Sequence, residues 1–281
     1  MTRIIIHGGF FTESSTDPET KKAKQEALTK IVSEGYHFLQ SHTAAETVAK
    51  VVELLEDDVL FNAGTGSQIQ ADGKVRLSAA IMNGHTRKFY GVLNIENVKN
   101  PIRVAESLAS VEDRVLGGEM ATAYARQKGF SDFEVRTPQR ISEYQAKLKS
   151  KGLGTVGCVA LDAQGNLAAA TSTGGKGFEI PGRISDSGTV AGNFATRHCG
   201  VSCTGVGEDI VSVALAASIC TRVADGQSLA SAYDKSFAEL KAIEGFAGAI
   251  AIDHQGNLYH QDSHPSMVFA AYDGITLTLF T

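Results

Sequence analysis

The chain has 281 residues, 43% of them hydrophobic and 20% charged, with 29 glycines and a formal net charge of −5. This composition is typical of a globular protein that can bury an extended core, and it contains no apolar run as long as a membrane span. The mildly acidic balance, without a basic run, argues against a nucleic-acid partner.

In chain order, the first predicted elements are a strand and two helices. The apolar run 4–6 predicts a short buried strand. A helix is expected to begin at Asp17, with Pro18 in its first turn. A second helix is expected from Thr43, because Glu46 three residues later completes a capping box.

The rest of the first half predicts strands followed by short helices. Residues 61–82 read as strand and hairpin around a turn at 71–74, and residues 90–93 read as a further short strand. Helices are expected from Asn100-Pro101, through 121–127, and from Pro138, the last of them charged and exposed.

The second half alternates strands and helices. Residues 157–167 and 248–258 share one pattern, which predicts two hairpins with Gly-Asn in their turns. Helices are expected over 208–224 and 228–243. Strands, then helices, then strands indicate an α+β fold in which sheets pack between helical layers.

The dipeptide Gly154-Thr155 stands where the chain changes from a charged helix to an apolar strand. If this bond were cut, Thr155 would carry both a hydroxyl and a free α-amine. The amine, whose pKa is ordinarily about 7.7–8.0, could then act as the base that activates the hydroxyl. The dipeptide alone is common, so its neighbourhood has to carry the prediction.

The ordered sequence signals resemble those of the plant-type L-asparaginase/isoaspartyl aminopeptidase family of N-terminal-nucleophile hydrolases. The resemblance covers nearly the whole chain, and six short segments in the right order carry it: Ile6-His7-Gly8-Gly9, Leu60-Phe61-Asn62-Ala63-Gly64, Gly154-Thr155-Val156-Gly157, residues 168–175, residues 181–187 and Cys203-Thr204-Gly205-Val206-Gly207-Glu208.

The resemblance implies one αββα sandwich domain over 1–281. It implies that the chain cuts itself into an α subunit, 1–154, and a β subunit, 155–281, which remain associated and assemble as a dimer of αβ units. The implied reaction is hydrolysis of the side-chain amide of L-asparagine and of β-aspartyl (isoaspartyl) dipeptides, with release of L-aspartate. No cofactor is expected for catalysis.

Thr155 matches the family's nucleophile and Thr173 matches its second active-site threonine. Thr173 would orient the nucleophile, whereas Thr171 and Ser172 are expected to face elsewhere. Arg183 and Asp186 match the residues that hold the substrate's amino-acid end. The guanidinium suits the α-carboxylate and the carboxylate suits the α-ammonium.

Thr204 and Gly205 match the oxyanion hole, which the Thr204 hydroxyl and the Gly205 backbone N–H would form. Asn62 matches the residue of the α subunit that contacts the nucleophile. The loop around Asn62 resembles the family's sodium loop, whose backbone carbonyls correspond to Leu55, Glu56, Asp58, Phe61, Ala63 and Thr65.

Other metal or phosphate sites are not favoured by the sequence. His260 and His264 have an i, i+4 spacing, but the surrounding pattern indicates strand rather than helix. Cys199 and Cys203 lack a C-x-x-C spacing, and the four cysteines are expected to be buried free thiols. Residues 64–67 lack the lysine of a phosphate loop.

Two alternatives remain open at this point. A glycosylasparaginase-like amidase usually has Asp before its threonine and a secreted or lysosomal setting, whereas Gly154 precedes Thr155 here and no signal peptide is visible. We therefore expect a cytoplasmic protein. The other alternative is an uncleaved, non-catalytic protein that binds aspartyl ligands. Ser185 and residues 188–190 depart from the usual pattern beside the substrate clamp and leave the preferred amide open.

Overall fold

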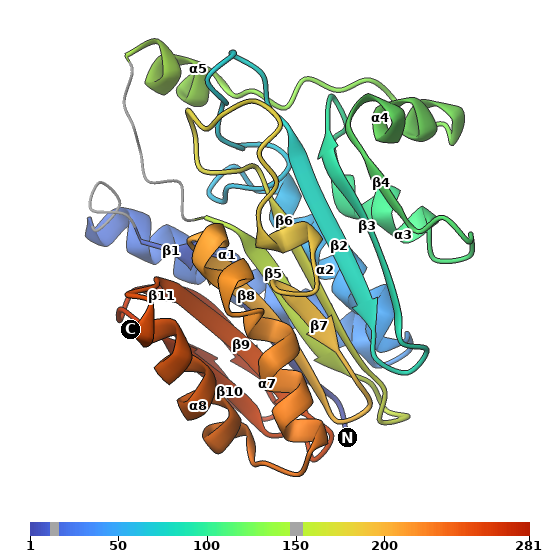
Figure 1. Cartoon of the computed structure of the whole chain (residues 1–281), viewed down its shortest axis with the longest axis vertical. Coiled ribbons are helices and arrows are strands. Elements are labelled where there is room, and N and C mark those ends of the chain that lie inside the picture. Colours follow the sequence, from blue (N-terminus) through green and yellow to red (C-terminus); the bar gives the residue numbers. More distant parts are fainter. Residues whose placement is uncertain (12–16, 147–153) are drawn as a thin grey trace.

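The computed structural model describes residues 1–11, 17–146 and 154–281 of the chain. Two β-sheets lie face to face, and helices cover the outer side of each (Figure 1). The larger sheet consists, in spatial order, of β12 (Leu277–Leu279), β11 (Met267–Tyr272), β1 (Arg3–Phe10), β5 (Val156–Leu161), β6 (Leu167–Thr173), β2 (Leu77–Asn83), β3 (Lys88–Ile95) and β4 (Val115–Gly117). The smaller sheet consists of β10 (Leu258–Asp262), β9 (Ala247–Asp253), β8 (Cys199–Gly205) and β7 (Asn193–Ala195).

The helices form the two outer layers. The larger sheet packs against α1 (Pro18–Leu39), α2 (Ala44–Asp57) and α3 (Pro101–Ser107), and the smaller against α7 (Leu215–Ala224) and α8 (Leu229–Ala242). Figure 1 shows α7 and α8 in front of the smaller sheet and α2 behind the larger one. Each sheet shares a buried apolar cluster with its helices. The predicted α+β, αββα sandwich is confirmed.

Side-chain caps predicted from the sequence begin α1 and α2. The Asp17 side chain accepts from the Thr20 amide at the start of α1, and Thr43 and Glu46 form the expected capping box at the start of α2. The later helices of this half also begin near their predicted positions: α3, α4 (Gly118–Gln127) and α5 (Pro138–Gln145), the last with no buried residue. None of the helices among the described residues combines the length and the apolar character that crossing a membrane requires.

Two sequence-based predictions were wrong in their extent. Residues 61–76 form turns and loop, and only Leu77–Asn83 is a strand, because Gly64, Gly66 and Gly73 adopt positive φ angles that a strand does not allow. The predicted helix 208–224 is two helices, α6 (Gly207–Ser212) and α7. Ala214 interrupts them in the left-handed conformation, with φ 47° and ψ 48°.

Strand register brings three chain segments to one end of the sandwich. β5 and β6 form the predicted hairpin, and Val156 pairs with Ser172, so the start of β5 lies beside the end of β6. β5 faces β8 of the smaller sheet. A side chain at Gly200 of β8 would meet Val159 of β5, and a side chain at Gly157 of β5 would meet Ser202 of β8. β8 therefore runs along the length of β5 and carries its last residues, Thr204 and Gly205, to the level of Thr155.

Candidate active site

The two predicted threonines lie together at this end of the sandwich. Thr155 precedes β5, Thr173 ends β6, and the Thr155 hydroxyl lies 3.1 Å from the Thr173 hydroxyl. Both side chains are buried, with Thr155 7% exposed and Thr173 4% exposed. Burial and this contact leave the Thr155 hydroxyl few orientations.

The Gly154 carbonyl, which precedes Thr155, is held by the loop that follows α2. The backbone N–H of Asn62 donates to the Gly154 oxygen across 3.2 Å. The Asn62 side chain ties this loop to its neighbours, because its amide donates to the Gly175 carbonyl at 2.6 Å and its oxygen accepts from the Gln68 amide at 2.9 Å. A side chain at position 154 would come within 2.7 Å of the Asn62 Cβ. Glycine is therefore required for this close approach.

Arg183 and Asp186 converge on Gly207, just beyond β8. A Cβ at position 207 would lie 2.8 Å from Asp186 Oδ1 and 3.1 Å from Arg183 Nη2. Asp186 is buried, and its Oδ2 has no hydrogen-bond partner among the described residues. Burial raises the pKa of Asp186 to about 7, while Arg183 acts in the opposite direction.

Glu208 shares the guanidinium of Arg183, a relationship that the sequence reading did not propose. Arg183 Nε and Nη2 each lie 2.7 Å from a different oxygen of the Glu208 carboxylate, and Lys176 Nζ lies 3.4 Å from it. The hydrogen bonds from Arg183 lower the pKa of Glu208 to about 2. Its place as the last residue of the segment 203–208 was the only sequence signal.

Thr204 and Gly205 have the features expected of oxyanion donors. The Thr204 hydroxyl is fully buried, and its Oγ1 has no partner among the residues that the structure describes. Gly205 has a φ of +136°, and a Cβ there would come within 2.5 Å of the Phe246 carbonyl. An unpaired buried hydroxyl is costly unless water or a ligand completes it.

A polar cluster behind Thr155 was missed by the sequence reading. His7 Nδ1 lies 3.0 Å from the Thr155 carbonyl, and His7 Nε2 lies 2.9 Å from the Ser202 hydroxyl. The Ser202 hydroxyl in turn lies 2.7 Å from that of Thr171. The expectation that Thr171 and Ser172 face away from Thr173 holds only for Ser172, which bonds to Glu56 on the helix side. A histidine directly after three buried isoleucines was the available signal.

The predicted carbonyl ligands lie around the carboxyl end of α2. Leu55 and Glu56 belong to its last turn, where helix carbonyls lack intrahelical partners. A Cβ at Gly66 would lie 2.9 Å from the Val59 carbonyl oxygen and 3.0 Å from that of Phe61, so carbonyls also converge from the following loop. Neutral carbonyl oxygens are ligands for a hard cation, and those of Glu56 and Asp58 already accept from the N–H groups of Thr65 and Phe61. The Glu56 side chain is buried and accepts hydrogen bonds from the Ile102 N–H and the Ser172 hydroxyl, and burial raises its pKa to about 8.

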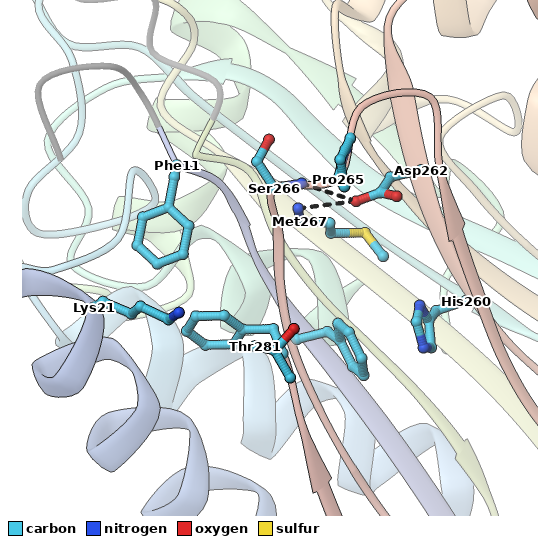
Figure 2. A pocket seen from close by; sticks show the side chains of 10 residues that line it. Phe11, Lys21, His260, Asp262, Pro265, Ser266, Met267 and Thr281 are labelled. Atoms are coloured by element: carbon cyan, nitrogen blue, oxygen red, sulfur yellow. Dashed lines mark hydrogen bonds between the residues drawn. The ribbon is translucent and has the colours of Figure 1, made fainter. Parts of the chain in front are cut away.

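The disfavoured histidine and cysteine sites gain no support. His264 stacks on Phe246 and His260 packs on Phe269. Within 1–11, 17–146 and 154–281, no three His, Cys, Asp or Glu side chains group as metal ligands, and all four cysteines are buried free thiols. His260 instead lines a cavity of about 360 Å³ (Figure 2), together with Phe11, Lys21, Asp262, Pro265, Ser266, Met267, Phe269, Phe280 and Thr281. This cavity does not include Thr155.

The fold, with a threonine hydroxyl at the start of a central strand, is that of the N-terminal-nucleophile hydrolases. More specifically, the chain belongs to the asparaginase family, whose model matches residues 1–278.

Relatives with assigned names agree with this family. A protein of Synechocystis sp. named isoaspartyl peptidase/L-asparaginase is 42% identical over 98% of this chain and 89% of its own length. A plant-type L-asparaginase of Thermococcus kodakarensis is 33% identical over 96% of each chain. An isoaspartyl peptidase of Salmonella typhimurium is 36% identical over 91% of this chain and 90% of its own.

Proposed function

We propose that this chain hydrolyses the side-chain amide of L-asparagine and the β-aspartyl bond of isoaspartyl dipeptides, after breaking its own Gly154–Thr155 bond. The observation that carries the proposal is the buried contact of 3.1 Å between the hydroxyls of Thr155 and Thr173, directly after a glycine carbonyl. The names of the relatives supply the substrate class.

In the proposed maturation, the Thr155 hydroxyl oxygen attacks the Gly154 carbonyl carbon. The C–N bond then breaks, the nitrogen takes up the hydroxyl proton, and Gly154 becomes an ester on Thr155. The Asn62 N–H, already on the Gly154 oxygen, stabilises the charge that develops there. Water hydrolyses the ester, which leaves the Gly154 carboxylate and restores the Thr155 hydroxyl beside the amine freed in the preceding step.

In each catalytic cycle, the new amine accepts the hydroxyl proton as Thr155 attacks the side-chain carbonyl of the substrate. The Thr204 hydroxyl and the Gly205 N–H donate to the oxyanion. The protonated amine then gives its proton to the leaving nitrogen, which departs as ammonia or as the amine of the second residue. Water hydrolyses the β-aspartyl ester by the same proton transfers and releases aspartate.

The clamp for the substrate's amino-acid end is formed by Arg183 and Asp186. Glu208 occupies two N–H groups of Arg183 and fixes the plane of the guanidinium, whose remaining N–H groups are available to the substrate α-carboxylate. Asp186 Oδ2, which has no hydrogen-bond partner among the described residues, would accept from the substrate α-ammonium.

The strand order supports the proposal that the two fragments stay together. β5 and β6 follow the cut, yet β5 pairs with β1 and β6 pairs with β2, both of which precede it. β11 also follows the cut and pairs with β1, so separation would break three antiparallel ladders inside one sheet. We further propose assembly as a dimer of αβ units, a cytoplasmic location, and a structural Na⁺ held by the carbonyls of Leu55, Glu56, Asp58, Phe61, Ala63 and Thr65, with no cofactor for catalysis.

The test begins with the purified chain after incubation. Edman sequencing of the fragment that follows the cut should read Thr-Val-Gly, and asparagine or β-aspartyl dipeptides should yield aspartate. Thr155→Ala should stay intact and release none, whereas the matched variant Thr155→Ser, which keeps the hydroxyl, should retain partial cleavage. An active fragment that begins at any other residue would refute the mechanism. An intact wild-type chain whose melting point rises with aspartate would indicate a binding protein.

A further inference from the structure

The polar cluster of His7, Ser202 and Thr171 lies between the two sheets, where the surrounding layers are apolar. His7 is on β1 and Thr171 on β6 of the larger sheet, and Ser202 is on β8 of the smaller one. All three side chains have an exposed fraction of 0%. Polar groups in such a layer destabilise the fold unless every one of them is paired. Here each of the three side chains has a hydrogen-bond partner.

The partners of His7 define which of its nitrogens carries the proton. The Thr155 carbonyl can only accept, so Nδ1 must donate to it. Burial lowers the pKa of His7 to about 3, so the ring is neutral and Nε2 is an acceptor. The Ser202 hydroxyl therefore donates to Nε2, and the Thr171 hydroxyl can donate to Ser202. Each group in the network therefore donates to the next one, from Thr171 through Ser202 and His7 to the Thr155 carbonyl.

The backbone is shaped to let this network reach Thr155. A side chain at Gly157 would collide with both Ser202 Oγ and His7 Nε2, so only glycine leaves the space open. The ladder between β1 and β5 ends at the pair His7–Gly157, and the register of β1 shifts beyond His7. Thr155 thus lies outside this ladder, and a side chain supplies a hydrogen bond to its carbonyl.

We propose that His7 is a positioning residue, which acts through the Thr155 carbonyl to keep the amine and hydroxyl of Thr155 in place. The inference rests on the proposed function. Once the Gly154–Thr155 bond is broken, Thr155 loses its covalent anchor on one side. Its carbonyl bond to His7 and its hydroxyl contact with Thr173 then hold the residue, and the carbonyl bond restricts rotation about the Cα–C bond. Ser202 and Thr171 hold the ring in the tautomer that donates.

Two amide replacements of His7, each of which matches the position of one ring nitrogen, separate its two contacts. In His7→Asn the side-chain amide falls near the Nδ1 position, so the donor to Thr155 is kept, and Ser202 still has the Ala170 carbonyl at 3.3 Å. In His7→Gln the amide falls near the Nε2 position, so the contact with Ser202 is kept and the donor to Thr155 is lost. Both remove the imidazole, so a merely structural role predicts similar behaviour.

The experiment measures kcat and KM for asparagine on the cleaved fraction of each variant. We expect His7→Gln to lower kcat at least tenfold with KM within about twofold, and His7→Asn to recover most of that loss, because misplacing a nucleophile by about 1 Å lowers rates by up to about 10². Equal kcat values for the two variants, or a loss confined to KM, would overturn the proposal.

A second pair covers the case in which either His7 variant fails to fold. Thr171→Val removes the hydroxyl at nearly constant shape, and Thr171→Ser keeps it. A lower kcat in Thr171→Val alone supports the positioning role, and equal kcat values in the two overturn it. A wild-type chain that yields no fragment beginning at Thr155 would instead overturn the proposed function and this inference with it.

Discussion

The backbone N–H of Asn62 donates to the carbonyl oxygen of Gly154 across 3.2 Å, so the peptide group proposed for self-cleavage already has a hydrogen-bond donor on its oxygen. This donor belongs to a loop that the Asn62 side chain anchors at Gly175 and Gln68. The arrangement polarises the carbonyl before any attack and places it at the start of β5, beside the hydroxyl of Thr155.

The first prediction concerns the rate of maturation. Asn62→Ala removes the side-chain hydrogen bonds to Gly175 and Gln68. It should slow self-cleavage at least tenfold, since the N–H that stabilises the oxyanion is then held less firmly in place. The measurement is a time course of intact and cleaved chain after rapid purification. Asn166→Ala is the matched control, because Asn166 lies at the opposite end of the β5–β6 hairpin. An unchanged rate in Asn62→Ala would contradict this role.

The second prediction concerns the oxyanion donor. Thr204→Val should lower kcat of the cleaved protein by ~10²–10³, while Thr204→Ser, which keeps the hydroxyl, should stay near the wild-type value. Because the hydroxyl is buried without a partner among the described residues, its removal should leave the melting temperature unchanged or raise it. A valine variant with normal kcat would show that this hydroxyl plays no part in the reaction.

The third prediction concerns substrate binding and pH. The pKa of Asp186 is about 7, so the carboxylate that would bind the substrate ammonium forms as the pH rises from 6 to 8. KM for asparagine should fall by up to about tenfold over this range, and it should be higher and flat in Asp186→Asn. Initial rates at several pH values measure KM separately from kcat, which also follows the Thr155 amine.

The raised pKa of Asp186 also makes the free energy of unfolding depend on pH. Because the folded-state pKa of about 7 exceeds the ordinary value of 3.8, this carboxyl stabilises the fold fully below about pH 4, and the contribution is lost as the pH rises from there through about 7. Asp186→Asn should therefore gain stability relative to the wild-type residue toward pH 8. A KM that is independent of pH together with no such gain would contradict the assignment of Asp186.

The fourth prediction concerns His7 and acid stability. The folded pKa of about 3 lies below the ordinary value of 6.5, so the unfolded chain binds a proton that the fold excludes between these values. Stability should fall by about 1.4 kcal/mol per pH unit from roughly pH 6 to pH 4 on account of this group. Urea unfolding of the intact Thr155→Ala chain, with and without His7→Asn, isolates the effect. Parallel pH profiles would exclude it.

Much of the fold could be predicted because local signals decide where elements begin. The three isoleucines in 4–6, the cap at Asp17 and the capping box at Thr43 each act within a few residues. The predictions were wrong where contacts between residues distant in sequence determine the local conformation. The loop 61–76 follows positive φ angles that only the tertiary fold requires, and Ala214 adopts a conformation that its residue type disfavours.

The site was predictable where the residues follow one another in recognisable segments. Thr155, Thr173, Arg183, Asp186 and Thr204 were all named from such segments, and the fold brings them to one end of the sandwich, although their roles stay predictions. The link from His7 to Ser202 spans 195 positions, and no spacing along the chain indicates it. Which ring nitrogen of His7 carries the proton depends on the Thr155 carbonyl, and only the folded structure places that carbonyl beside the ring.

The ion pair of Arg183 and Glu208 has a consequence for the environment in which the protein works. An unaccompanied guanidinium in a pocket attracts any small anion, and phosphate, sulfate or chloride would then compete with the amino acid. Here the carboxylate of Glu208 faces the guanidinium through two hydrogen bonds and is ionised over the physiological range. The Glu208 carboxylate therefore offsets the charge of the Arg183 guanidinium, and common buffer salts should be weak inhibitors.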